Sequence, residues 1–241
     1  MIQGHFRRNY FQLLLGLSLL GAMYPLLEIE GRASITADIV WTVAFCAVLY
    51  LALRTIVVKR RELLVARTLM MAAVGLNVLG VIVESLYSTT RVSNAILLPS
   101  RFFSLCFLGQ STFAILREVA MPGKVTINRI WGATCVYIMM GLCWAYVFSL
   151  LTLLWRESLL FCGEPPTDPA NMSLMLYFSF TTLTTLGFGD VVPSTPVARL
   201  ASGVEAVMGQ LFLTVVVARL VGLHITHQRH EEQADEAPEE R

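Results

Sequence analysis

The residues with the most evident chemistry in this chain form a short run of threonines and glycines in its C-terminal third. The run reads Thr-Thr-Leu-Thr-Thr-Leu-Gly-Phe-Gly-Asp and occupies residues 181–190. Backbone carbonyls that point to one side can replace the water shell of a cation. Such a backbone needs unusual φ and ψ angles, which Gly187 and Gly189 adopt without a steric penalty. The run is therefore compatible with a loop whose backbone carbonyls point to one side and could contact a cation.

The composition around this run is that of a membrane protein. Of the 241 residues, 56% are hydrophobic and only 15% are charged, whereas about a quarter are charged in a soluble domain. A helix needs about 20 apolar residues to cross a bilayer. The net charge of +1 gives no sign of a nucleic-acid partner. We predict six spans: Tyr10–Leu27, Ile39–Val58, Leu63–Tyr87, Ala95–Leu116, Ile130–Leu154 and Val197–Leu223.

Lysine and arginine predict the orientation of these spans. Six spans place four basic groups on one side of the membrane: Arg7 and Arg8; Lys59, Arg60 and Arg61; Arg117, Lys124 and Arg129; Arg219 and Arg229. Basic loops stay in the cytoplasm, so both termini should be cytoplasmic. No small-residue cleavage site follows the first apolar segment, so we expect that segment to be retained. The short loops suggest a bacterial inner membrane.

The segment between the last two spans has two parts. Arg156–Pro169 is polar and proline-rich and should be an exposed turret. Met172–Thr184 is apolar and long enough for a half-membrane helix, with Asp168 or Asn171 as its N-cap. The C-terminal end of that helix would carry partial negative charge toward the loop and favour a cation. Non-helical backbone at membrane depth must be buried or line a watery cavity, so the loop requires an oligomer.

The threonine run, the half-helix and the two flanking spans together resemble the potassium channel family. The resemblance covers Ile130–Leu223 well and Met1–Lys124 only by topology. It implies a homotetramer around a central pore, embedded in the lipid bilayer. The implied selectivity filter is Thr185, Leu186, Gly187, Phe188 and Gly189, with K⁺ held by the carbonyls of the first four and by the Thr185 hydroxyl. The implied supporting residues are Thr184, Asp190, Tyr177, Phe178 and Glu205.

Two departures from the family pattern affect the filter. Leu-Gly-Phe-Gly replaces the commoner Val-Gly-Tyr-Gly, so Phe188 lacks a hydroxyl that could bond to neighbouring aromatic residues. Thr181 stands where some relatives have a glutamate that holds the filter aspartate. We therefore expect selectivity to survive and Asp190 to lack that partner.

The last span contains a glycine and an ionisable residue. Gly209 matches the hinge glycine of the family's inner helices, or it permits close helix packing. Leu213, Val217 and Val221 recur at helical spacing and would line a hydrophobic gate or face lipid and protein. Glu205 is an ionisable residue inside a predicted span, where a charge is costly, so we expect it to have a function. We expect it to bond to Thr181 or Thr182 behind the filter rather than to coordinate the ion, and a pair with Arg199 would be loose.

Steep voltage gating is not expected. The fourth span carries only Arg101, with Arg117 at its inner edge. One charge crossing 100 mV is worth about 2.3 kcal/mol, so four subunits would gain about 9 kcal/mol against the tens available with three or four charges each. The first four helices are then a scaffold or a sensor of another stimulus.

These observations predict an all-α membrane protein with six transmembrane helices and a re-entrant pore helix and filter loop between the fifth and sixth. Residues 1–124 would be a four-helix domain of degenerate voltage-sensor-like topology, residues 125–223 the pore domain, and residues 224–241 a short acidic cytoplasmic tail that is disordered from Glu231. His224, His227 and His230 in the tail would sense protons, bind a metal or be solvated. Cys162 would be a free thiol or form an inter-subunit disulfide.

The predicted function is passive, potassium-selective conduction, with no enzyme activity and no cofactor besides the transported ion. Two alternatives remain. One is a weakly selective cation channel, and the other is a receptor or transporter that does not conduct.

Overall fold

Between residues 60 and 235, the part of the chain that the structure describes most fully, the fold has five α-helices and two short strands. In the computed structural model, α3 spans Arg60–Tyr87, α4 Thr90–Ala120, α5 Ile127–Leu154, α6 Met172–Leu183 and α7 Pro196–Asp235. A 3-10 turn at Arg156–Ser158 leads into strand β1, Leu159–Phe161, and strand β2 is Val191–Pro193. The structure describes residues 16, 43–44, 46–47, 49–50, 60–87, 90–121, 127–166, 168 and 171–235.

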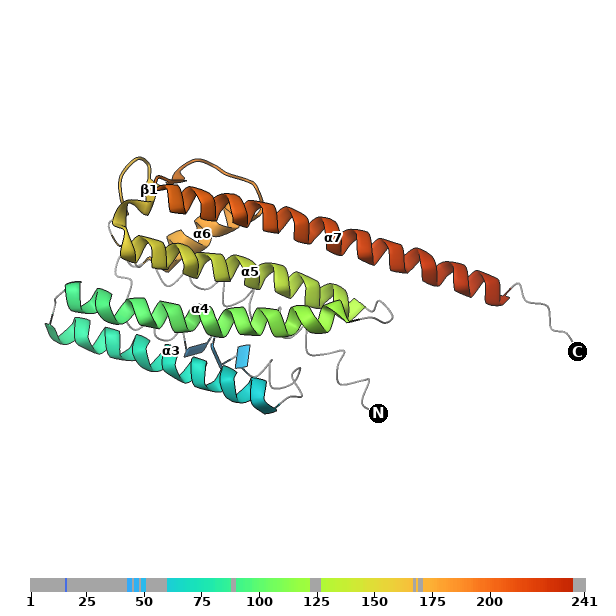
Figure 1. Cartoon of the computed structure of the whole chain (residues 1–241), viewed down its shortest axis with the longest axis horizontal. Coiled ribbons are helices and arrows are strands. Elements are labelled where there is room, and N and C mark those ends of the chain that lie inside the picture. The colour runs from blue at the N-terminus through green and yellow to red at the C-terminus, as the bar shows by residue number, and fades with distance from the viewer. Residues whose placement is uncertain are drawn as a thin grey trace, which may run out of the picture.

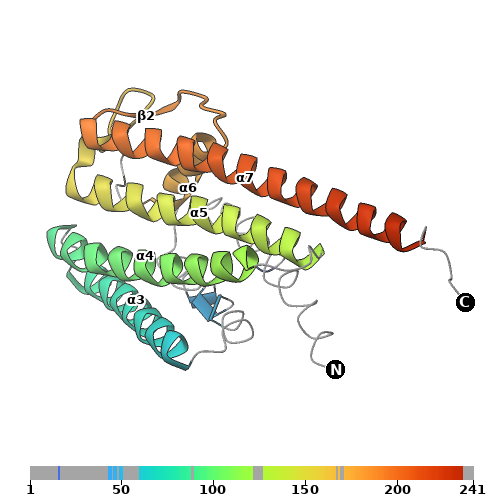
Figure 2. The ribbon, with the colours of Figure 1, turned by 45° about the vertical axis from the view of Figure 1, so that its right-hand side comes forward.

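The long helices lie side by side in chain order. Figure 1 shows α3, α4 and α5 stacked across the molecule, with α7 along the far side of α5. The short helix α6 lies between α5 and α7, as the turned view in Figure 2 also shows. Helix α6 therefore packs against the two helices that flank it in the sequence, α5 and α7.

Three helices are long and apolar enough to cross a membrane among the residues that the structure describes: Arg61–Gly80, Arg129–Leu154 and Pro196–Val216. They correspond to the third, fifth and sixth predicted spans. The fourth predicted span forms α4, whose composition does not reach the same level of hydropathy. The first and second predicted spans lie almost wholly outside the described residues.

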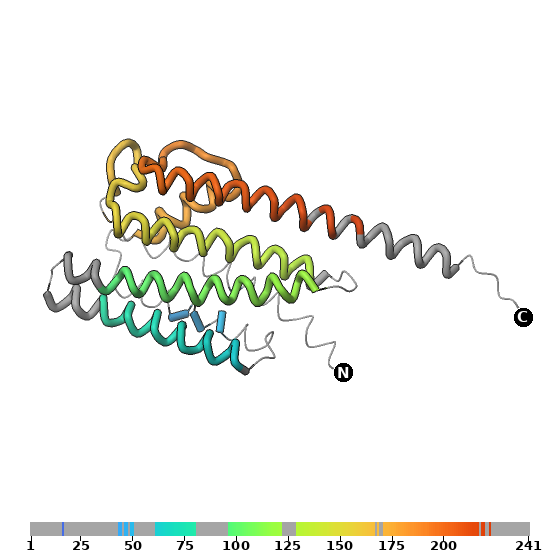
Figure 3. Tube along the Cα trace, viewed as in Figure 1, coloured from blue at the N-terminus to red at the C-terminus, as the bar shows by residue number. Residues whose placement is uncertain are grey.

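Helix α7 is longer than the span that its hydropathy predicts. It continues past Leu223 to Asp235 and includes His224, His227 and His230. Figure 1 shows the helix extending beyond the other helices, and Figure 3 follows the coloured first part of its Cα trace alongside α5. The prediction of disorder from Glu231 is therefore wrong for residues 231–235. Backbone hydrogen bonds of a helix do not require apolar side chains, so polar residues can extend a span into water.

The fold is not purely helical, which corrects the all-α prediction. Strands β1 and β2 pair antiparallel, with Leu159 opposite Pro193 and Phe161 opposite Val191. The amide of Cys162 extends this ladder by donating to the Asp190 carbonyl at 2.8 Å. The expected exposed turret is thus tied by backbone bonds to the residues that directly follow the filter run.

The contact between α5 and α6 is close because of a glycine. A Cβ at Gly141 would lie 2.7 Å from the Phe180 ring. Nearby, Phe148 of α5 meets Phe178 of α6 edge to face, with 4.8 Å between ring centroids. Phe178 is thus part of the core between the two helices.

Gly141→Ala should destabilise the protein by about 1–3 kcal/mol, since an added methyl group in a packed site displaces its neighbours. Gly75→Ala in α3 is the matched control, because a Cβ there meets no atom within 4 Å. Thermal unfolding of the two purified variants in detergent would measure the difference. Equal melting temperatures would contradict the close packing of α5 on Phe180.

Candidate functional site

Helix α6 begins with a side-chain cap and ends at the threonine run. The Asn171 side chain accepts a hydrogen bond from the Leu174 amide at 2.9 Å, which confirms one of the two predicted caps. The helix ends at Leu183, and Thr184 is its C-cap. The cap fixes the start of α6. The helix ends after twelve residues, directly before the predicted ion-binding loop.

The backbone of the loop alternates in conformation. Thr185, Gly187 and Gly189 have φ angles of 60°, 53° and 82°, whereas Leu186 and Phe188 between them do not have positive φ. Left-handed backbone costs a residue with a Cβ about 1–2 kcal/mol, so the two glycines stand where they avoid that cost. Thr185 bears it.

The amide groups of the loop are turned toward α6. The Leu186 and Gly187 amides both donate to the Thr181 carbonyl, at 2.8 and 3.1 Å. In a trans peptide unit the C=O points opposite to the N–H of the next residue. The carbonyls of Thr185 and Leu186 therefore point away from α6, toward the open side of the chain, and are free to contact a ligand there.

The side chains of the loop are not covered by their own chain. Leu186 is 57% exposed and Phe188 is 66% exposed. Phe188 stacks on Tyr177, with ring centroids 6.3 Å apart and an interplanar angle of 3°. Thr184 donates its hydroxyl to the Phe180 carbonyl at 2.6 Å. Two large apolar side chains of the loop are therefore left uncovered by the described part of the chain.

Asp190 has a partner that sequence reasoning missed. The Tyr177 hydroxyl donates to Asp190 Oδ2 at 2.7 Å, and the Val191 amide donates to Oδ1 at 3.0 Å. Thr181 makes no bond to Asp190 and donates its hydroxyl to the Phe178 carbonyl, so the partner at position 181 is absent as expected, but Tyr177 supplies another. Tyr177 lies on α6 one turn before position 181, where some relatives have the glutamate. Its hydroxyl bonds to Asp190 and its ring stacks on Phe188.

Tyr177→Phe should loosen the loop while keeping the ring stack, because it deletes only the donor to Asp190. We expect the current to decline several-fold faster under sustained conduction than in the unmodified protein. Asp190→Asn and the double variant complete the test, since two residues that share one bond should show non-additive effects. Additive effects in patch recordings would mean that the Tyr177–Asp190 bond does not support the loop.

Gly209 lies against the last turn of α6. A Cβ at Gly209 would be 2.4 Å from the Leu183 carbonyl oxygen and 2.9 Å from its Cδ1. The same carbonyl accepts a hydrogen bond from the Tyr137 hydroxyl of α5 at 3.3 Å. Helix α7 runs through Gly209 without a break. Of the two roles left open for this glycine, close packing is the one with a direct contact.

Glu205 bonds to α6, but not at the expected residues. Its Oε1 lies 2.5 Å from Ser179 Oγ, whereas the Thr181 hydroxyl donates to the Phe178 carbonyl. Each residue along a helix turns by about 100°, so Thr181, two residues after Ser179, faces the other side of α6. Arg199 donates to the Pro193 carbonyl at 3.3 Å, and no ion pair with Glu205 forms among the described residues.

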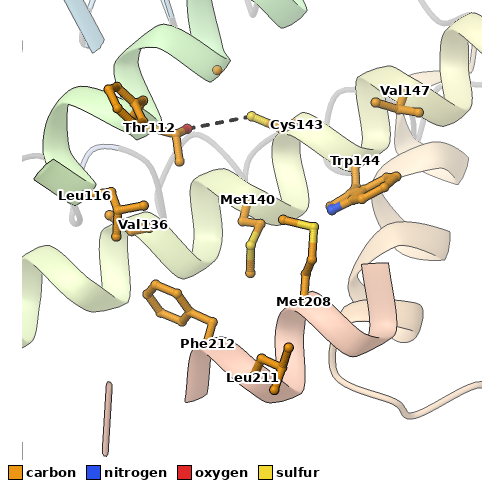
Figure 4. A pocket seen from close by; sticks show the side chains of 12 residues that line it. Thr112, Leu116, Val136, Met140, Cys143, Trp144, Val147, Met208, Leu211 and Phe212 are labelled. Carbon is orange, nitrogen blue, oxygen red and sulfur yellow. Dashed lines mark hydrogen bonds between the residues drawn. The ribbon is translucent and has the colours of Figure 1, made fainter. Parts of the chain in front are cut away.

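The part of α7 beyond Gly209 borders a cavity. An apolar cavity of about 470 Å³ lies between α4, α5 and α7. Figure 4 shows Thr112, Met140 and Phe212 among the side chains that line it. Leu213 is 40% exposed. Of the other two predicted gate residues, Val217 and Val221, the structure describes the helical backbone only.

Two arginines connect the end of α4 to α5 and α7. Arg219 of α7 donates to the carbonyls of Ala120 and Met121, at 2.9 and 3.2 Å. Arg129 of α5 donates to the Met121 carbonyl at 2.9 Å. Basic side chains stabilise the free carbonyls and the partial negative charge at a helix C-terminus. The inner part of α7 is therefore held to α4.

Arg101 is held inside the protein. It is 6% exposed, and its guanidinium carbon lies 5.8 Å from the centroid of the Tyr146 ring of α5. This is the distance of a cation–π contact, so the one basic residue in the middle of α4 packs against its neighbour.

Cys162 lies in the turn after β1. It is exposed, has a φ of 50° and forms no disulfide within the chain, so its predicted inter-subunit disulfide stays a prediction.

Comparison with known proteins defines the class to which this site belongs. Residues 147–224 match a protein family described as "Ion channel". This segment includes α6, the loop and the membrane span of α7. Residues 147–224 are therefore similar to an ion channel domain, in a chain that is a multi-pass integral membrane protein.

Two curated relatives that match part of the chain are potassium channels by name. The chain is 35% identical over 65 residues to the Two pore potassium channel c of Oryza sativa subsp. japonica, which is 27% of this chain and 14% of that protein. It is 29% identical over 78 residues to the Potassium voltage-gated channel protein shk-1 of Caenorhabditis elegans, which is 32% of this chain and 15% of that protein. The chain is thus distantly homologous to potassium channels, while it spans about one seventh of these relatives' length. No solved structure matches it.

Proposed function

We propose that the protein is a potassium-selective channel that conducts K⁺ passively across the membrane. The observation that carries the proposal is the backbone of residues 185–189. Its alternating conformation and its amides bonded to Thr181 leave the Thr185 and Leu186 carbonyls directed away from α6. Stacked rings of such carbonyls replace the hydration shell of K⁺. Thr185, Leu186, Gly187 and Phe188 would supply the rings, with the Thr185 hydroxyl innermost.

The proposal includes a homotetramer, because one loop cannot enclose an ion. Non-helical backbone at membrane depth needs protein or a watery cavity around it. Leu186 and Phe188 are both more than half exposed in the single chain. Four copies around a central axis would bury these side chains against neighbouring subunits and bring four sets of carbonyls together.

The wider architecture of the proposal has six spans and cytoplasmic termini in a bacterial inner membrane. Residues 1–124 form the peripheral domain, residues 125–223 the pore domain and residues 224–241 the tail. Leu213, Val217 and Val221 would line the inner cavity and its gate. The contact of Arg219 with the end of α4 supports mechanical coupling between the peripheral domain and that gate.

Weak dependence on voltage is part of the same proposal. A gating charge must move through the membrane field to contribute energy. Arg101 is buried against Tyr146, in a contact between α4 and α5 that such a movement would break. The stimulus that opens the pore must therefore act on other groups.

Flux into liposomes tests the proposal. Purified protein should admit K⁺ far faster than Na⁺, at acidic or at neutral pH. Comparable rates for both ions would favour the alternative of a weakly selective cation channel, with a filter loosened by Phe188. Absence of flux from a stable tetramer under every condition would favour the non-conducting alternative.

A further inference from the structure

The Glu205 carboxyl lies where three helices meet. It belongs to α7, is fully buried, and has Oε1 2.5 Å from Ser179 Oγ of α6. Ser179 Oγ in turn lies 2.7 Å from the carbonyl oxygen of Gly141 in α5. One row of three oxygen atoms therefore connects the helices on both sides of the pore helix to the pore helix itself.

Both short distances in this row need a proton. A backbone carbonyl only accepts hydrogen bonds, so the proton between Ser179 and Gly141 belongs to the Ser179 hydroxyl. A serine hydroxyl has one proton to donate. The proton between Ser179 and Glu205 must then belong to Glu205. If Glu205 were ionised, the single Ser179 proton could serve only one of its two oxygen neighbours, the Gly141 carbonyl or Glu205 Oε1. The other pair of oxygens would then be in close contact with no proton between them.

Burial favours the same arrangement. Glu205 Oε2 has no hydrogen-bond partner among the residues that the structure describes. A buried carboxylate is stable only when it is paired and hydrogen-bonded, whereas an unpaired buried polar oxygen of a neutral group costs far less. A neutral acid leaves Oε2 as a carbonyl oxygen with no charge to compensate.

We propose that Glu205 is a neutral carboxylic acid whose Oε1 proton is donated to Ser179, and that it acts as a positioning residue for the pore helix. The relay runs from Glu205 to Ser179 to the Gly141 carbonyl, and it holds α7, α6 and α5 at a fixed spacing. Ser179, the middle member of the relay, lies two residues before Thr181 on α6. The Thr181 carbonyl accepts hydrogen bonds from two amides of the filter loop. The placement of the proton stands on geometry alone, whereas its effect on conduction rests on the proposed function.

Infrared spectroscopy of the reconstituted protein at neutral pH tests the placement of the proton. A protonated carboxylic acid has a C=O stretch that is separate from the bands of a carboxylate. We expect such a band in the unmodified protein, a shift of it with ¹³C-labelled glutamate, and its loss in Glu205→Gln. Glu157→Gln, which removes an exposed carboxylate outside the spans, should leave the band unchanged. An acid band that Glu205→Gln does not reduce would overturn the proposal.

Flux measurements on the same samples test the positioning role. Glu205→Gln keeps a donor to Ser179, so its K⁺ flux should stay within about twofold of the unmodified rate. Glu205→Ala removes the donor and should lower flux by about tenfold, consistent with the loss of one buried hydrogen bond. Equal flux in both variants would overturn the positioning role. The acid band can be measured in protein that does not conduct, so its presence without any flux would contradict only the proposed function.

Discussion

Gly209→Ala is expected to disrupt the proposed pore domain more than alanine at either of the other glycines of α7, Gly203 and Gly222, where a Cβ meets nothing within 4 Å. The new Cβ would lie 2.4 Å from the Leu183 carbonyl oxygen, a backbone atom that cannot rotate away. Helix α7 or the end of α6 would have to move, and overpacking of this kind costs about 1–3 kcal/mol in each subunit. We expect a lower melting temperature and loss of K⁺ over Na⁺ selectivity in liposome flux, because Leu183 directly precedes the loop.

Gly203→Ala is the matched control on the same helix. A Cβ at Gly203 meets nothing within 4 Å, and alanine favours a helix over glycine by about 1 kcal/mol. This variant should keep or gain stability and keep its selectivity. If Gly209→Ala were as stable and selective as Gly203→Ala but gated differently, Gly209 would be a hinge and the packing account would be wrong.

Gly187→Ala is the second change with a large expected effect. Gly187 has a φ of 53° and no atom within 4 Å of a Cβ position, so the penalty comes from the backbone and not from a clash. Left-handed backbone costs an alanine about 1–2 kcal/mol in each subunit. Relief of that strain would rotate the peptide units on either side of residue 187. We expect a protein that still assembles but conducts K⁺ and Na⁺ at similar rates.

Gly163→Ala separates this effect from general destabilisation. Gly163 has a φ of 90° and open space around it, but it lies in the turn after β1. The substitution applies a similar backbone strain outside the filter, so stability should fall while selectivity is unchanged. Selective conduction by Gly187→Ala would contradict the assignment of the filter to residues 185–189.

The parts of the fold that sequence predicted well have local causes. Helix α6 begins after Asn171 because an asparagine side chain can cap the next residues of its own chain. Positive φ at Gly187 and Gly189 follows from the absence of a Cβ. Both signals are contained in a few consecutive residues, so no tertiary contact is needed to find them.

The features that were missed depend on residues far apart in the chain. The Tyr177–Asp190 bond and the β1–β2 ladder form only after the turret and the loop fold back on each other. The choice of Ser179 over Thr181 as the partner of Glu205 depends on the rotation of α6 relative to α7, which hydropathy does not encode. The sequence offered one signal for the Tyr177–Asp190 bond, which is that Tyr177 is an aromatic residue with a hydroxyl on the helix before the loop.

The reversal potential under bi-ionic conditions tests the central claim most directly. With K⁺ on one side of a planar bilayer and Na⁺ on the other, a carbonyl filter at residues 185–189 predicts a current that reverses at a strongly potassium-selective potential. A reversal potential near zero would show that the open pore passes both ions alike, and would contradict the claim that this loop selects K⁺.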